Sequence, residues 1–466
     1  MGTMAKSFKK RFIGDKKFYK TVLAVALPIM IQNAITNLVT LVDNVMVGSL
    51  STEAMSGVSI VNQFTFIFNL LVFGIVSAGG IFTAQYYGKK DVDGVRNTFR
   101  LKVIMNLFAG VLGVASFIIF KSQLINLFLH EGTEGDLVLT LNYGIEYLMV
   151  LVIGFIPFAM YQSYASTMRE TGDTVTPMIA SVSAVVVNCV LNAVFIFGLL
   201  GLPAMGVKGA ALATVISRFV ELFILIFKTS LNKEKYSFIK GVFRNIKIPK
   251  TLIKQMIIKG LPLALNELLW AVATILRNQC YSTRGLDVVA AQNISTTLFN
   301  VFSVTYLALG QASAILVGAK LGANKIEEAL LDADKLNLFS VVATTAIAVV
   351  FSALAFVFPL AYNTSVPIRL LARDMMLTLG ATMPFVAYAH AIYFVMRSGG
   401  KVLITFLFDS VFMWVVVIPL CFILSRFTAM PIMHLFIICQ ATEVVKCLFG
   451  AMLYKRKTWA RTLVND

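Results

Sequence analysis

Long apolar stretches, repeated twelve times along the chain, are the feature that most limits how this sequence can fold. Each is long enough for an α-helix to cross the hydrocarbon core of a bilayer, which takes about 20 residues. Only 14% of the 466 residues are charged, whereas roughly 25% is typical of a soluble domain. The stretches lack the short alternating pattern of a membrane β-barrel. The sequence therefore predicts an all-α integral membrane protein.

Polar, glycine-rich and proline-rich breaks divide the chain into twelve predicted transmembrane helices. We expect them at residues 21–48, 54–86, 95–120, 137–162, 174–200, 208–228, 252–283, 286–318, 328–358, 367–396, 401–424 and 430–453. The predicted N-lobe, residues 21–228, contains the first six helices, and the predicted C-lobe, residues 252–454, contains the last six. A basic N-terminus (1–20), a basic linker (229–251) and a basic C-terminus (455–466) complete the chain.

Positive charge is concentrated before the first helix, in the second and sixth connections and at the end of the chain. Seven basic residues lie between Lys6 and Lys20, nine lie between Lys228 and Lys259, and the first connection, GSLSTEA, has none. Because basic loops stay in the cytoplasm, we expect a multi-pass protein of the cell membrane with both termini cytoplasmic. The net charge of +17 then reflects topology and attraction to anionic membrane lipids. We expect no nucleic-acid partner.

The second half of the chain repeats the first. The segment ALPIMIQN aligns with GLPLALNE, and this alignment matches Pro28 to Pro262. The same offset, called the repeat offset below, aligns SAGGIFTAQYYG with QASAILVGAKLG and so matches Gly88 to Gly322. A slightly smaller offset aligns MRETG with MRSGG. Six helices are an even number, so both halves start on the same side of the membrane. The repeat is therefore parallel, and we expect a pseudo-two-fold axis along the membrane normal.

Polar side chains form stripes along several of the predicted helices. In the first helix, steps of three and four residues place them on one face, and the seventh helix repeats this arrangement. Hydrogen bonds between helices would explain single Asn or Ser residues, but stripes on corresponding helices of both halves favour a water-filled cavity between the lobes. The candidate cavity residues are Asn33, Asn37, Thr40, Asn62, Trp270, Arg277, Asn293 and His390.

Asp43 lies on the polar stripe of the first helix, in a run that has no other charge from Thr21 to Gly48. An acid inside a membrane-spanning helix is a functional candidate, because burying an unpaired charge is costly. The alternative is that Asp43 lies near the outer end of its helix and only hydrogen-bonds the loop. Glu267 and Asp409 are the other acids well inside apolar runs.

Two further acids have a base three residues away on the same predicted helix. Glu221 follows Arg218, and Glu443 precedes Lys446. Residues at this spacing are neighbours on a helix surface. We therefore interpret both as within-helix ion pairs.

Arg277 aligns with Asp43 at the repeat offset, so the two halves carry opposite charges at equivalent places. A lone arginine in a spanning helix needs a carboxylate nearby. Glu267 is ten residues earlier, about 15 Å along the helix axis at 1.5 Å per residue. We therefore hypothesise that Arg277 pairs with Asp409.

Motifs for enzymatic chemistry are missing from the sequence. The three histidines are scattered, and HExxH, GxSxG and phosphate-binding glycine loops do not occur. No connection is long enough to hold a nucleotide-binding domain. We therefore expect a protein that is not an enzyme and has no cofactor and no bound metal. A membrane-embedded transferase is a distant alternative, which the absence of a paired nucleophile and base disfavours.

The chain resembles the multidrug and toxic compound extrusion (MATE) family over essentially its whole length. The resemblance rests on ALP…LVDNVMVGSLSTEAMSGVSI, GGIFTAQYYGKKD, MRETGDTVTPM and two sets of six helices. It implies two lobes in a V around a central cavity. It also implies export of amphipathic, often cationic compounds in exchange for H⁺ or Na⁺, by alternating access and without another cofactor. We expect a monomer.

The resemblance also implies roles for individual residues. Asp43 matches the acid of the family's first helix, and Pro28 matches the proline that can bend that helix. Many members have Asn and Asp four residues apart in the fifth helix, whereas this chain has Asn188 and Asn192.

In the C-lobe, many members have a Glu in the seventh helix and an Asp in the tenth. Glu267 lies about one turn before the former position, and the tenth helix has no acid at the latter. Only His390, and Asp409 in the eleventh helix, are ionisable nearby. The cation-coupling candidates are therefore Asp43, Asn188, Asn192, Glu267 and Asp409, and the incomplete acid set favours H⁺ over Na⁺.

A lipid-linked oligosaccharide flippase of the same superfamily is the alternative function. Such flippases share the twelve-helix plan and usually line the cavity with several basic residues that hold a pyrophosphate. In this chain Arg277 stands nearly alone among the candidate cavity residues, which favours the export of small molecules.

Overall fold

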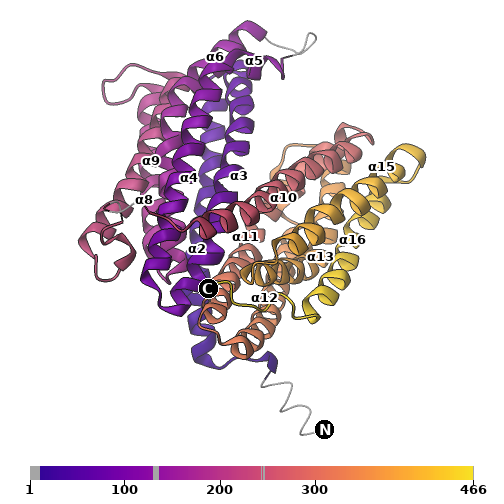
Figure 1. Cartoon of the computed structure of the whole chain (residues 1–466). Helices are drawn as coiled ribbons and strands as arrows, with labels where there is room; N and C mark the ends of the chain where they lie inside the picture. The colour runs from indigo at the N-terminus through magenta and orange to yellow at the C-terminus, as the bar shows by residue number, and fades with distance from the viewer. Residues whose placement is uncertain (1–10, 130–135, 243, 245–246, 465–466) are drawn as a thin grey trace. The chain divides into compact units, whose positions relative to one another are not determined.

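A computed structural model of the chain describes residues 11–129, 136–242, 244 and 247–464 (Figure 1). The first half contains α2 (Lys16–Gly48), α3 (Thr52–Lys89), α4 (Val92–Ile119), α5 (Lys121–Asn126), α6 (Leu137–Leu151), η1 (Val152–Gly154), α7 (Phe155–Glu170), α8 (Val175–Phe197), α9 (Gly206–Leu231) and η2 (Ser237–Ile239). The second half contains α10 (Lys250–Ser282), α11 (Leu286–Gly322), α12 (Ile326–Leu354), η3 (Phe358–Ala361), α13 (Val366–Ser398), α14 (Val402–Phe406), η4 (Leu407–Val411), η5 (Met413–Val417), α15 (Ile418–Phe427) and α16 (Ile432–Lys455).

Twelve helical spans in the described part of the chain are long and apolar enough to cross a membrane. They confirm the twelve predicted helices. Two spans are composite: α6, η1 and α7 together run from Leu137 to Glu170, and α14 to α15 together run from Val402 to Phe427. Local sequence sets several of the helix ends. The Asp91 and Asp136 side chains accept hydrogen bonds from the first backbone N–H groups of α4 and α6, which have no partner inside the helix.

The helices group into two compact units. The N-unit comprises residues 31–83 and 91–260. Its core lies among α3, α6, α7 and α9, where the stacked rings of Phe68 and Phe155 have centroids 4.4 Å apart. Part of the predicted linker packs into this unit, because Arg100 Nη2 donates to Gly241 O at 3.1 Å and Phe238 is buried.

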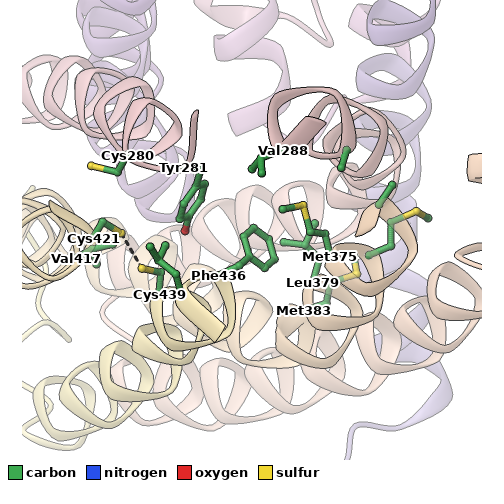
Figure 2. Close-up of a cluster of buried hydrophobic side chains, with 14 of the residues drawn as sticks. Cys280, Tyr281, Val288, Met375, Leu379, Met383, Val417, Cys421, Phe436 and Cys439 are labelled. Atoms are coloured by element: carbon green, nitrogen blue, oxygen red, sulfur yellow. Dashed lines mark hydrogen bonds between the residues drawn. The ribbon is translucent and has the colours of Figure 1, made fainter. Parts of the chain in front are cut away.

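The C-unit comprises residues 84–90, 261–464 and the described part of residues 1–30. Its helices α11, α12, α13 and α16 pack against one another. One core cluster, drawn in Figure 2, includes Tyr281, Phe436 and the sulfurs of Cys421 and Cys439, which lie 2.8 Å apart. All five cysteines are free. A second cluster includes Val22, Ala26 and Ile29 of the N-terminal half of α2.

Within the C-unit, the end of α3 crosses the end of α11 at very close range. A Cβ added at Gly88 would lie 1.7 Å from the carbonyl oxygen of Ala319, and one added at Gly322 would lie 1.8 Å from that of Gln85. The contact is reciprocal, since the repeat offset relates Gly88 to Gly322 and Gln85 to Ala319. Only glycine permits this approach of the two backbones.

The C-terminal segment after α16 is fixed against the same crossing. The Leu463 backbone N–H donates to Gln85 Oε1 at 2.7 Å, and Lys89 Nζ donates to Val464 O at 2.6 Å. The Trp459 ring is buried and stacks on Tyr454. The segment predicted as a C-terminal tail is therefore part of the folded C-unit up to Val464.

Candidate functional site

The N-unit contains a polar pocket of about 670 Å³. Side chains from α2, α3, α6, α8 and α9 line it, and its volume is within the range of small-molecule sites, about 300–1,000 Å³. The lining residues are Asn37, Asp43, Val47, Val58, Ser59, Asn62, Thr65, Phe66, Asn69, Tyr147, Leu151, Asn192, Ala210, Thr214 and Arg218. Four residues predicted as cavity or cation-coupling candidates therefore meet in one pocket: Asn37 and Asp43 of α2, Asn62 of α3 and Asn192 of α8.

Asp43 is held by the two asparagines of α8. Asn192 Nδ2 donates to Asp43 Oδ1 at 2.5 Å. In the amide orientation that satisfies both ends of Asn188, its nitrogen donates to the same oxygen at 3.0 Å and its oxygen accepts from the Thr214 backbone N–H at 3.3 Å. Both asparagines are buried. Their spacing of four residues places them on one face of α8, so the sequence was sufficient to group them.

The C-unit contains a second polar network, built on Asp409. Lys446 Nζ of α16 donates to Asp409 Oδ1 at 2.6 Å, and Asn266 Nδ2 of α10 donates to Asp409 Oδ2 at 3.0 Å. Tyr393 of α13 accepts from Asn266 at 3.3 Å and donates to Glu267 Oε1 at 3.5 Å. Tyr393 and Asn266 therefore connect the two acids of the C-unit, Glu267 and Asp409, in one network.

Asp409 lies in the π-helical turn η4, Leu407–Val411. A second π-helical turn, η5, begins after one intervening residue, Phe412. π-Helical turns are rare and often occur at functional sites. Here the local geometry is supported by Ser410, whose single hydroxyl hydrogen is shared between Asn266 O and Asn266 Oδ1, each 2.8 Å from Oγ.

The other predicted cavity residues lie outside the N-unit pocket. His390 of α13 is packed with its ring 5.0 Å from that of Tyr306, and its Nδ1 contacts Val386 O at 3.0 Å. Trp270 and Asn293 are exposed on α10 and α11. Asn33 is half-buried on α2.

Two predicted positions need separate mention. Pro28 lies inside the continuous helix α2, as Pro262 lies inside α10, and its role as a bend stays a prediction. The Thr40 side chain lies outside the described residues.

The predicted pair of Arg277 with Asp409 is wrong, and the two predicted within-helix pairs are not found as direct contacts between the described residues. Asp409 is paired with Lys446, not with Arg277, whose Nε is buried without a hydrogen-bond partner in the described part of the chain. Lys446 forms its ion pair with Asp409, and the described part of the chain has no ion pair between Lys446 and Glu443. Among the described residues no ion pair joins Arg218 to Glu221 either. Spacing along one helix cannot predict contacts with another helix, and contacts between helices determined these partners.

Sequence reasoning also missed four functional candidates: Lys446, Tyr393, Tyr147 and Arg218. Lys446 and Tyr393 complete the Asp409 network, and Tyr147 and Arg218 line the N-unit pocket. The available signal for Arg218 and Lys446 was that each is a cation inside an apolar run. Assigning each to an acid on its own helix hid that signal.

Twelve spans, and a polar pocket inside a helical unit, indicate a multi-pass membrane protein with an internal site for a small molecule. The model of the MatE family matches residues 28–194 and 262–423, more than half of the chain. The chain therefore belongs to the MatE family, whose members are transporters and not enzymes.

Curated relatives are similar over nearly the whole length. The probable multidrug resistance protein YoeA of Bacillus subtilis is 24% identical over 446 residues, which cover 94% of each protein. The probable multidrug resistance protein NorM of Thermotoga maritima is 24% identical and covers 96% of this chain and 94% of its own length.

Solved structures share the fold. A Vibrio cholerae MATE transporter superposes with a TM-score of 0.85 at 16% identity, covering 94% of this chain and 97% of its own. A MOP superfamily transporter from Pyrococcus furiosus gives a TM-score of 0.83 at 20% identity, covering 97% of this chain and 98% of its own. These likenesses confirm the predicted all-α membrane fold.

Proposed function

We propose that the chain is a secondary antiporter that exports amphipathic, often cationic small molecules in exchange for a cation. The names of its relatives, multidrug resistance proteins, support this proposal. The observation that carries it is the N-unit pocket, because a carboxylate held by Asn192 lines a space large enough for a small molecule. The carboxylate of Asp43 can hold either the coupling cation or a cationic substrate, and competition between the two would couple their movements.

The coupling ion is a proton rather than Na⁺. Hard metal cations need several converging oxygen ligands, whereas a proton needs one. At Asp43 the Asn192 neighbour presents an N–H group, not an oxygen, and no second acid lines the described pocket. The described residues contain no cluster of three or more His, Cys, Asp or Glu that could hold a metal ion.

The orientation in the membrane follows from the distribution of basic residues. Both termini and the linker lie in the cytoplasm of a multi-pass protein of the cell membrane. A single cysteine at the exposed position Lys233, in a cysteine-free background, tests this orientation. An impermeant thiol reagent should label it in inverted vesicles and not in intact cells.

The function is tested with purified protein in proteoliposomes loaded with a cationic dye. We expect a pH gradient to drive dye movement and an equal Na⁺ gradient to have no effect. The Asp43→Asn variant should lose the pH-driven movement and bind the cationic dye more weakly. Movement driven by Na⁺ alone would contradict proton coupling, and no dye movement under either gradient would contradict the antiporter.

A further inference from the structure

We propose that the N-unit has a binding site for an anionic phospholipid at the start of α10. Lys250 and Lys254 bind the phosphate, and the two acyl chains lie in two apolar hollows beside the first turns of the helix. The inference is independent of the proposed export function. All residues that line the hollows belong to the N-unit, because they lie within residues 91–260.

The first hollow, called the α4 hollow, has a volume of about 630 Å³. It lies between α4 and the start of α10, and apart from two lysines its lining is apolar. Phe108 is 65% exposed and Ile104 is 43% exposed, so the apolar wall is accessible from the outside of the helix bundle, where a membrane protein meets lipid. The lining residues are Leu101, Ile104, Met105, Phe108, Lys247, Ile248, Lys250 and Ile253.

The second hollow, called the α10 hollow, has a volume of about 380 Å³. Its lining residues are related by steps of three and four, so they lie along one face of α10. From Lys250 to Ile258 this face extends about 12 Å at 1.5 Å per residue. The hollow therefore has a charged end and an apolar remainder. The lining residues are Lys250, Ile253, Lys254, Ile257 and Ile258.

The two hollows meet at the residue that carries the charge, because Lys250 and Ile253 line both of them. A diacyl phospholipid has a corresponding arrangement, since its two chains extend from one headgroup. One chain in each hollow would place the phosphate beside Lys250. Lys254, one turn further along the same face, would contact it from the α10 hollow.

The headgroup end of the site is rich in positive charge. The sequence has no Asp or Glu from Lys235 to Asn266, a stretch that contains seven basic residues. Lys250 and Lys254 are exposed, and neither has an ion pair or a side-chain hydrogen bond among the described residues. Lysine stems lie along apolar surface while the ammonium group reaches the polar interface. Basic pockets between membrane helices bind anionic headgroups, so an anionic lipid satisfies both parts of the site.

The charge also determines the expected selectivity. Phosphatidylglycerol carries a net negative charge, which the two lysines attract. Phosphatidylcholine carries a phosphate and a quaternary ammonium group, so it would bring a second cation toward the same lysines. Like charges at close range repel, and we therefore expect the zwitterionic lipid to bind less tightly although its chains fit equally well.

The test is native mass spectrometry of the purified full chain in detergent. Dioleoyl phosphatidylglycerol and dioleoyl phosphatidylcholine compete at equal concentration, and their different masses identify each bound lipid. We expect the wild-type protein to prefer phosphatidylglycerol. The double variant Lys250→Gln with Lys254→Gln should weaken phosphatidylglycerol binding about tenfold, equivalent to about 1.4 kcal/mol. It should change phosphatidylcholine binding less than about twofold.

Lys228→Gln with Lys233→Gln is the matched control. Both lysines are exposed near the junction of α9 and the linker, and their removal lowers the net charge by the same amount. Neither lines a hollow, so this variant should keep the wild-type preference. Ile257→Asn keeps both lysines but makes the α10 hollow more polar, and it should weaken binding of both lipids. Glycerol 1-phosphate, which has the phosphate without the chains, should not displace phosphatidylglycerol.

Three results would overturn the site: no preference of the wild-type protein for phosphatidylglycerol, equal losses in the two double variants, or no loss in either. Displacement of the lipid by an equal concentration of glycerol 1-phosphate would show a site for soluble phosphate compounds and would also contradict the proposal. None of these measurements uses a dye or an ion gradient. Failure of the lipid site therefore leaves the export function standing, and failure of dye export leaves the lipid site standing.

Discussion

Neutralising Lys446 alone should destabilise the C-unit strongly, because it leaves Asp409 buried without its cation. The two side chains are 6% and 16% exposed, and Nζ lies 2.6 Å from Oδ1. At that distance, with an effective dielectric constant of about 20, the attraction is about 6 kcal/mol. Desolvation of both charges offsets much of this attraction. Removing one partner of a buried pair therefore costs about 3–5 kcal/mol, the range that we expect for Lys446→Met.

The double variant, Asp409→Asn with Lys446→Met, should recover about half of that loss. Methionine keeps the packing of the lysine stem, and asparagine can still accept from Asn266. Denaturant titration of the purified protein in mild detergent measures the free energy of unfolding of the double variant and of the two single variants, Lys446→Met and Asp409→Asn. If the loss in free energy of unfolding of the double variant equals the sum of the losses of the two single variants, the Asp409–Lys446 pair is not the source of the stability.

An exposed ion pair provides the control for these measurements. Lys208 Nζ lies 3.2 Å from Glu146 Oε1, and both side chains are about half exposed. Such pairs contribute at most about 1 kcal/mol. Lys208→Met should therefore change the free energy of unfolding much less than Lys446→Met.

Three other predictions follow from single contacts. Gly88→Ala should lower the yield of folded protein in size-exclusion chromatography, because its Cβ would lie 1.7 Å from Ala319 O. Asp173 lies in the loop before α8. Burial alone would raise the pKa of its carboxyl group, but hydrogen bonds from Lys235 and neighbouring groups outweigh burial, so the pKa lies below its ordinary value. Its ion pair thus stabilises the fold above the ordinary pKa of 3.8 and loses effect as the pH falls through the lowered value. Asp173→Asn should melt earlier than wild type at neutral pH, with a difference that shrinks on acidification. Asp43→Asn should stop pH-driven export in proteoliposomes and weaken binding of the cationic dye.

The controls and contrary outcomes are equally specific. Gly48→Ala adds a Cβ that meets only the flexible Met55 side chain, with Sδ at 3.3 Å, and should fold normally. If Gly88→Ala folds as well as Gly48→Ala, the close helix crossing is not required. A melting difference for Asp173→Asn that is independent of pH would contradict its ion pair. Wild-type rates of pH-driven export by Asp43→Asn would exclude that carboxylate as the coupling group.

Much of the fold could be predicted from the sequence, because hydrocarbon leaves few options for a polypeptide backbone. Each apolar run must satisfy its own backbone hydrogen bonds, so the length and position of the runs predict the helices. The helical period also grouped Asn188 with Asn192 on one face of α8. The π-helical turns at Asp409 had no such signal, since nothing in the local sequence LFDSV distinguishes them from an ordinary helix.

The charged partners could not be predicted, because a periodic pattern gives the face of a helix but not the helix that it meets. Lys446 is 37 residues from Asp409, and Glu443, only three residues away, was the nearer acid in sequence. Buried charges make contacts wherever packing brings a partner within hydrogen-bond distance. Sequence proximity is therefore a poor guide to ion pairs inside a helical membrane protein.

The duplication has kept backbone contacts and changed charges. Gly88 and Gly322 make equivalent contacts, each with the backbone of the other helix. A side chain at either position would clash with that backbone, whichever substrate the protein transports. Charged residues do not all follow this symmetry: Asp43 aligns with Arg277 at the repeat offset. Packing constrains both halves in the same way, but an ionisable group depends on the ligand or partner of its own half. The function of each half must therefore be read from its own contacts, and symmetry alone would have placed a cation where the N-unit holds Asp43.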